Sequence, residues 1–187
     1  MKLNSETLKP EVSRSSSVQK MILAAVFMAL GLLLPFVTGQ IPQIGMMLLP
    51  MHIPVLLCGF LCGWPYGLLV GFITPLFRSV LFGMPPLYPT AAAMAFELAA
   101  YGFFSGFFYD KFPKKISFTY ITLLLAMIMG RIVWGFVSLL FYSAMGKGFT
   151  WAMFMGGAVI NAVPGIILQI ALIPALVAAL QKLSNNH

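Results

Sequence analysis

Charged residues are scarce in this sequence: only 8% of its 187 residues are Asp, Glu, Lys or Arg, whereas soluble domains carry about 25%. Hydrophobic residues make up 60%, and the mean hydropathy is +0.97. This composition excludes a soluble globular domain. Because a helix needs about 20 apolar residues to cross a bilayer, the chain has enough of them for five or six spans. The sequence therefore predicts an all-α integral membrane protein.

Cysteine and histidine are also rare, with two of each. Cys58 and Cys62 lie four residues apart in one apolar run, where a disulfide would have poor geometry and further metal ligands are missing. The sequence contains neither the zinc motif H-E-x-x-H nor a phosphate-binding loop G-x-x-x-x-G-K-[ST]. We therefore expect no metal, no other cofactor and no ATP hydrolysis by this chain, and we expect both cysteines to be packing residues.

Acidic residues number four against eleven Lys and Arg, which gives a formal net charge of +7. The cations stand mainly at the ends of apolar runs, and no nucleic-acid-binding motif is present. We therefore interpret them as signals for orientation in a membrane and not as a nucleic-acid surface.

Six apolar runs follow a polar, Ser-rich segment. Residues 1–19 are predicted to be a disordered cytoplasmic tail, and residues 20–182 a six-helix membrane domain. No A-x-A-like cleavage site follows the first run, which favours a retained span over a signal peptide. The second run contains Pro50 and Pro54 and should be irregular at its start. The runs comprise about residues 21–37, 46–63, 66–82, 90–109, 117–143 and 152–181.

The cations outside the spans predict the orientation of the protein. With the N-terminus inside, the external segments contain only Lys147, whereas the cytoplasmic segments contain eight cations. Because Lys and Arg concentrate on the cytoplasmic side of membrane proteins, both termini are predicted to face the cytoplasm. The eight cations are Lys2, Lys9, Arg14, Lys20, Lys111, Lys114, Lys115 and Lys182.

Four polar residues within the spans suggest a function: Arg78, Glu97, Arg131 and Asn161. Ionisable groups in a membrane are costly and by default mark a functional interior. At about 1.5 Å of rise per residue, all four lie in the outer half of the membrane, although they come from four different spans. The inner half has only Gln169 as a comparable group. The pattern predicts a ligand cup that is open to the outside, and it disfavours a continuous channel.

Aromatic residues are placed where they would line or cover this cup. Tyr101 lies one helical turn from Glu97, and Trp134 lies one turn from Arg131. Tyr88, in a proline-rich external loop, is a candidate lid residue together with residues 38–51.

Charges inside the predicted cup sum to +1, since two arginines face one glutamate. If one arginine pairs with Glu97, the other remains to bind an anionic group. A carboxylate suits a guanidinium because two hydrogen bonds form at once. The alternative is a purely structural network of Arg78, Glu97 and Arg131. His52 is interpreted either as a ligand contact or as a buried hydrogen-bonding residue.

Small residues recur at a spacing of four. The pairs are Gly59/Gly63, Gly67/Gly71, Gly102/Gly106 and Ala25/Ala29. Such pairs let helix backbones approach closely in lipid, and we expect them to hold helices of this chain together.

These features resemble a known transporter family. Six spans, the A-x-x-x-A at Ala25 and Ala29, and the tight turn GWPYG (63–67) resemble the substrate-binding S components of energy-coupling factor (ECF) vitamin transporters. The segments LLPMHIPVLLCGFLCG (48–63) and FGMPPLYPTAAAMAFELAAYG (82–102) look most like the pantothenate-type S components. The resemblance covers about residues 20–180.

The resemblance implies a high-affinity binding subunit in the plasma membrane of a prokaryote. Such a subunit delivers a small water-soluble vitamin or precursor by toppling in the membrane, while docked on a transmembrane coupling protein that carries two cytosolic ATPases. It assigns Ala25 and Ala29 to contact with the coupling protein. Pantothenate has a carboxylate, hydroxyls and an amide, and it is compatible with the candidate binding residues His52, Arg78, Glu97, Tyr101, Arg131, Trp134 and Asn161.

Several alternatives remain open. An S component for pyridoxine or hydroxymethylpyrimidine would use Glu97 for a ring nitrogen and leave both arginines structural. A structural membrane protein would not need four polar residues at one depth, and a stand-alone secondary carrier would show uptake without an ATPase. An intramembrane enzyme is disfavoured because Ser105 has no partner histidine at matching depth.

Overall fold

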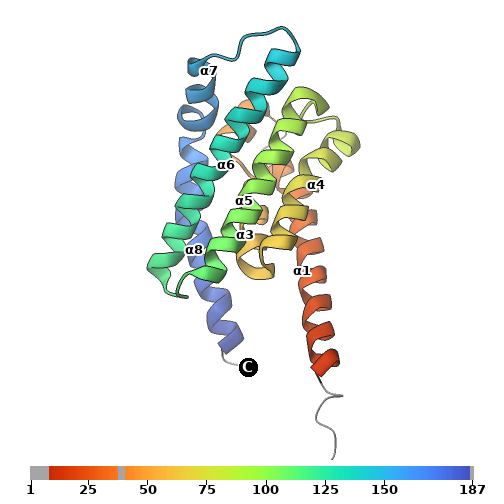
Figure 1. Cartoon of the computed structure of the whole chain (residues 1–187), viewed down its shortest axis with the longest axis vertical. Coiled ribbons are helices and arrows are strands. Elements are labelled where there is room, and N and C mark those ends of the chain that lie inside the picture. The colour runs from red at the N-terminus through yellow and green to blue at the C-terminus, as the bar shows by residue number, and fades with distance from the viewer. Residues whose placement is uncertain (1–8, 38–40, 186–187) are drawn as a thin grey trace, which may run out of the picture.

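The computed structural model describes residues 9–37 and 41–185, and every regular element within them is helical (Figure 1). The long apolar runs account for this, because a helix satisfies its own backbone polar groups in a membrane. The helices are α1 (Lys9–Val37), α2 (Pro42–Leu48), α3 (His52–Cys62), α4 (Trp64–Phe82), α5 (Ala92–Lys111), α6 (Ile116–Ala144), α7 (Trp151–Met155) and α8 (Val163–Asn185), with the short helical segments η1 (Leu87–Ala91) and η2 (Gly156–Ile160).

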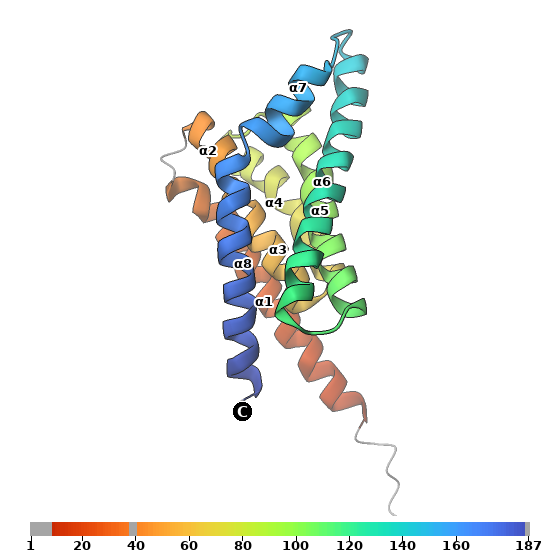
Figure 2. The ribbon, with the colours of Figure 1, turned by 90° about the vertical axis from the view of Figure 1, so that its left-hand side faces the viewer.

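The helices run up and down in one bundle (Figures 1 and 2). The start of α1, the end of α8 and the loop between α5 and α6 lie at the same end, which we name the lower end. The turns that follow α4 and α6 lie at the opposite, upper end. α5 packs against α3, α4 and α6, and it therefore occupies the centre of the bundle.

Within the described residues, five helical stretches are long and apolar enough to cross a membrane: Ser17–Val37, Trp64–Phe82, Leu87–Lys111, Ile116–Ala144 and Trp151–Leu180. The second predicted span, 46–63, is divided. α2 ends at Leu48, Leu49 has a left-handed φ of 51°, and α3 contains only 11 residues. At about 1.5 Å per residue, α3 covers roughly half of the apolar bilayer core. The irregular start that its two prolines predicted is therefore confirmed.

α1 begins earlier than the sequence suggested. It is helical from Lys9, whereas residues 1–19 were expected to form a disordered tail, and residues 1–8 of that tail lie outside the described residues. A helix extends readily beyond its apolar segment, because each added residue gains a hydrogen bond once the helix exists. The hydroxyl of Tyr66 donates to the backbone carbonyl of Ser17 at 3.4 Å, which connects this part of α1 to α4.

α4 and α5 are in backbone contact in the lower half of the bundle. A Cβ atom at Gly102 would overlap the backbone of Gly67, and a Cβ atom at Gly71 would overlap that of Leu98. The predicted role of these three glycines in helix packing is confirmed. Gly63 differs, because its φ of 96° places it in the turn between α3 and α4, where a residue without a side chain is favoured.

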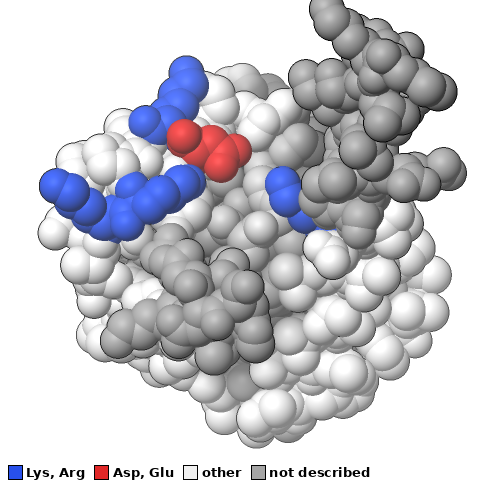
Figure 3. Space-filling model, turned by 90° about the horizontal axis from the view of Figure 1, so that it is seen from below, with Lys and Arg blue, Asp and Glu red and all other residues white. Residues whose placement is uncertain are grey.

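Basic side chains gather at the lower end of the described molecule. Lys111, Lys114 and Lys115 lie around the α5–α6 loop and are exposed, and Figure 3 shows basic side chains there next to a small acidic group. Nζ of Lys114 is 3.8 Å from Oδ1 of Asp110. Lys147 belongs to the loop at the upper end.

Candidate functional site

A cavity of about 380 Å³ lies in the upper half of the bundle. Its volume falls within the range of small-molecule sites, which is about 300–1,000 Å³. Most lining residues are apolar, with a few polar groups between them. They are Pro35, Ile41, Gly45, Leu49, Pro50, Met51, His52, Arg78, Met84, Pro85, Pro86, Thr90, Met94, Glu97, Arg131, Trp134, Gly157 and Asn161.

Glu97 and Arg131 form an ion pair in the cavity wall between α5 and α6. Nη1 of Arg131 donates to Oε1 of Glu97 at 2.7 Å. Nε and Nη2 of the same guanidinium are buried and have no hydrogen-bond partner among the described residues. One edge of Arg131 is therefore unused in a site where an unmade hydrogen bond is costly.

His52 lies against this ion pair at the start of α3. Its Nε2 is 3.5 Å from Oε1 of Glu97, and neither ring nitrogen makes a hydrogen bond within the described part of the chain. The ring of Tyr101 packs edge to face against the imidazole, with the centroids 5.1 Å apart. Tyr101 does not line the cavity; it is buried one turn further along α5, where it supports His52.

Arg78 lies near the upper end of α4 and is 3% exposed. Its guanidinium is 4.9 Å from the ring centroid of Phe36 and 5.4 Å from that of Phe82, and its Nη1 donates to the carbonyl of Leu32. Unlike Arg131, it forms no ion pair with any described carboxylate. Aromatic faces and a carbonyl stabilise the cation, but no described residue neutralises it.

Trp134 and Asn161 complete the predicted set. The indole of Trp134 packs so closely on Gly157 that a Cβ atom there would lie 2.6 Å from it, and it stacks on Phe154 at 6.1 Å. Asn161 follows η2, where the backbone leaves that segment to begin α8. Both residues line the cavity. Thus six of the seven predicted binding residues border one space, and Tyr101 supports it.

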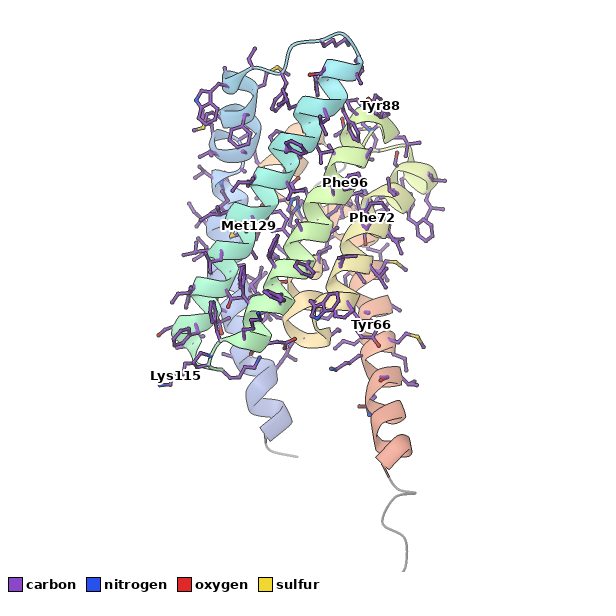
Figure 4. The ribbon with its side chains drawn as sticks, viewed as in Figure 1. Tyr66, Phe72, Tyr88, Phe96, Lys115 and Met129 are labelled. Carbon is purple, nitrogen blue, oxygen red and sulfur yellow. The ribbon has the colours of Figure 1, made fainter. Side chains whose placement is uncertain are left out.

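Tyr88, the predicted lid residue, does not line the cavity. It is 49% exposed, its hydroxyl donates to the carbonyl of Phe141 at 3.2 Å, and its ring lies against that of Phe141. Figure 4 shows it at the upper end, beside α6. The physical reason is its extended backbone (φ −127°, ψ 135°), which interrupts the helical geometry of η1. Its neighbours Pro86 and Thr90 line the cavity instead.

Ala25 and Ala29 lie on the exposed surface of α1, whereas Ala24 and Phe27 face the core. The expectation that this small-residue pair would hold helices of this chain together is therefore wrong. We name this exposed pair the α1 strip; small residues there would allow another helix to approach α1 closely.

Several lining residues were missed from the sequence. Thr90 and Met94 precede Glu97 by seven and three residues, and Gly157 precedes Asn161 by four; this spacing places each on the same helical face as the predicted residue. The helical spacing in the sequence could therefore have identified these three lining residues. The lining residues contributed by the segments between helices, such as Met84 and Pro85, have no periodic signal.

Cys58 and Cys62 are free and buried in the core, as packing residues would be. No group of three or more His, Cys, Asp or Glu side chains is arranged to hold a metal ion in the described part of the chain.

Comparison with curated proteins and with solved structures finds no match. One family model, described as "ECF transporter, substrate-specific component", matches residues 19–177, which include the whole cavity wall. Members of this family are substrate-binding subunits of transporters and not enzymes, and their partners are a small-molecule substrate and an ECF module. Together with its several apolar helices, this match shows that the chain is a multi-pass membrane protein belonging to the substrate-specific components of ECF transporters.

Proposed function

We propose that the chain is a high-affinity subunit that binds a small, water-soluble vitamin or precursor bearing a carboxylate, with pantothenate as the candidate that fits best. The observation that carries this proposal is Arg78, a nearly enclosed cation in the cavity wall with no ion-pair partner among the described residues. With Arg131 neutralised by Glu97, the cavity has a net charge of +1. An anionic group on the ligand would balance it.

The lining also favours a flexible aliphatic ligand over a flat ring. Among the described lining residues, Trp134 is the only Phe, Tyr or Trp; the other apolar walls come mainly from proline and methionine. A pyridine or pyrimidine would gain most from offset or edge-to-face contact with several aromatic rings. Pyridoxine or hydroxymethylpyrimidine therefore remains the second candidate, supported by the presence of the Glu97 carboxylate beside His52.

The proposed topology has six crossings, with α2 and α3 together forming the second. The basic residues around the α5–α6 loop support a cytoplasmic lower end, since positive residues are retained on that side of the membrane. The cavity would then open to the outside of a prokaryotic plasma membrane, and both termini would lie inside. The exposed alanines Ala25 and Ala29 would contact the transmembrane coupling protein of a module driven by two ATPases.

The test is mass spectrometry of small molecules released from the protein after purification in detergent. A ligand bound at nanomolar affinity, about −12 kcal/mol, should survive purification. We expect pantothenate from the unmodified protein and from Lys147→Gln, which removes a cation from the upper loop, and none from Arg78→Gln. Release of a pyridine or pyrimidine vitamin would replace the carboxylate proposal with the second candidate. If the purified protein releases no small molecule and binds none of a panel of vitamins, both the carboxylate proposal and the second candidate are contradicted.

A further inference from the structure

The deep end of the cavity contains polar groups that this chain leaves unsatisfied. Nε and Nη2 of Arg131 and both ring nitrogens of His52 are buried without hydrogen-bond partners among the described residues, and both side chains line the cavity. Nε and Nη2 form one edge of the guanidinium. Since buried polar groups are rarely left unpaired, a ligand group is expected to occupy this position.

The charge around Arg131 limits what that group can be. Glu97 already pairs with this guanidinium at 2.7 Å, so a second carboxylate would place two anions against one cation. A neutral oxygen can accept from the free edge without that repulsion. Neutral imidazole offers one donor and one acceptor. A hydroxyl or an amide, which donates and accepts, matches both residues.

Arg78, the cation without an ion-pair partner among the described residues, lies at a different level along the bundle axis from the Glu97–Arg131 ion pair. Gly71 on α4 packs against Leu98, the residue after Glu97, and this contact fixes the level of the ion pair on α4. Arg78 is seven residues further along α4, or about 10 Å at 1.5 Å per residue. The cavity therefore has two polar sites separated along the bundle axis.

We infer that the cavity binds a two-ended ligand in one orientation, with its carboxylate toward Arg78 at the upper end and a hydroxyl or amide against Arg131 and His52 at the deep end. This inference rests on the proposed function and adds the direction in which the ligand lies. Arg131 acts as a hydrogen-bond donor to a neutral group, and Arg78 is the anion site.

The experiment compares two probes by calorimetry on the purified full chain: pantothenate, and its analogue in which CH₂OH replaces the carboxylate. In the unmodified protein we expect the analogue to bind about 10- to 100-fold more weakly, as expected for one charge-assisted contact. In Arg78→Gln that difference should disappear. In Arg131→Lys, which keeps the positive charge beside Glu97 but loses the two-donor edge, both probes should weaken by the same factor and the difference should persist.

The second variant for the deep end is His52→Leu, which changes no charge pair and should weaken both probes equally. Loss of the carboxylate preference in Arg131→Lys or His52→Leu, with its retention in Arg78→Gln, would reverse the orientation and overturn the inference. Tight binding of pantothenate with no preference over the analogue would overturn the inference while leaving pantothenate as the substrate. Failure of both probes to bind the unmodified protein would overturn the proposed function, and the orientation with it.

Discussion

Glu97 and Arg131 form an asymmetric ion pair: the carboxylate is 3% exposed and the guanidinium 14%, with 2.7 Å between the bonded atoms. Both side chains line the cavity, but Glu97 is the more enclosed of the two and therefore depends on Arg131 for its neutralisation. The pair is at once part of the fold and part of the cavity wall.

Removing one member of this pair should destabilise the protein strongly. Arg131→Ala leaves a buried carboxylate unpaired and should lower the free energy of unfolding by about 3–5 kcal/mol. The double variant Glu97→Gln with Arg131→Met removes both charges and should lose clearly less. Thermal unfolding in detergent measures both. If the double variant is as unstable as the summed losses of the single variants Glu97→Gln and Arg131→Met, the pair is not coupled.

Side chains at the α4–α5 contact should prevent close packing. Gly102→Leu places a side chain where even a Cβ atom would overlap the backbone of Gly67, so the helices must separate. We expect a loss of about 3 kcal/mol or more in unfolding free energy, by analogy with overpacked cores. Gly148→Ala is the control, because a Cβ atom there meets nothing within 4 Å. Equal stability of the two variants would contradict the backbone contact.

Bulky residues on the α1 strip should separate binding from transport. Ala25→Trp or Ala29→Trp should abolish uptake in cells but leave ligand binding by the purified protein unchanged, since both positions are exposed and away from the cavity. Leu30→Trp is the control, because it is exposed on a different face of α1. If the alanine variants also lose binding, the strip contributes to the fold and not to a partner contact.

Gly165 should determine how long a ligand stays bound. A Cβ atom at Gly165 would lie 2.7 Å from the carbonyl oxygen of Met47 and 2.9 Å from the carbonyl carbon of Leu48, so this glycine seats α2 against α8. α2 contributes Gly45 to the cavity wall.

In Gly165→Ala the added methyl group must displace α2 and with it part of the cavity wall. We expect ligand dissociation to accelerate by about 10-fold, equivalent to about 1.4 kcal/mol. Stopped-flow measurement of dissociation checks this. Gly156→Ala should behave like the unmodified protein, because a Cβ atom there meets nothing within 4 Å. Unchanged dissociation in Gly165→Ala would show that α2 is held in place by other contacts.

The depth of the polar residues could be predicted from the sequence, because helical rise converts position along the chain into depth. Arg78, Glu97, Arg131 and Asn161 were placed at related depths, and all four border one cavity. The break before α3 was also predictable, since Pro50 disfavours a helix that continues through it, and Pro54 is tolerated only near the start of a new helix, where the structure has it.

Rotation about the helix axis and the direction of loop side chains were not predictable. Tyr101 is one turn from Glu97, yet it faces the ring of His52 and not the cavity. Tyr88 turns toward Phe141 because its backbone is extended. The outward direction of Ala25 and Ala29 depends on which side of α1 the rest of the bundle covers, and one helix pattern alone does not contain that information.

The distribution of regular and interrupted helix also determines where the molecule can change shape. The interruptions at residues 49–51, 83–91 and 156–162 surround the cavity at the upper end, whereas glycine contacts join α4 and α5 below it. Where two backbones are in contact, no side chains lie between them that could rearrange. We therefore expect α4 and α5 to keep their relative positions below the cavity. If the ligand enters at the upper end, as the proposed topology requires, its release on the far side of the membrane would have to move α4 and α5 together, and with them the bundle as a whole.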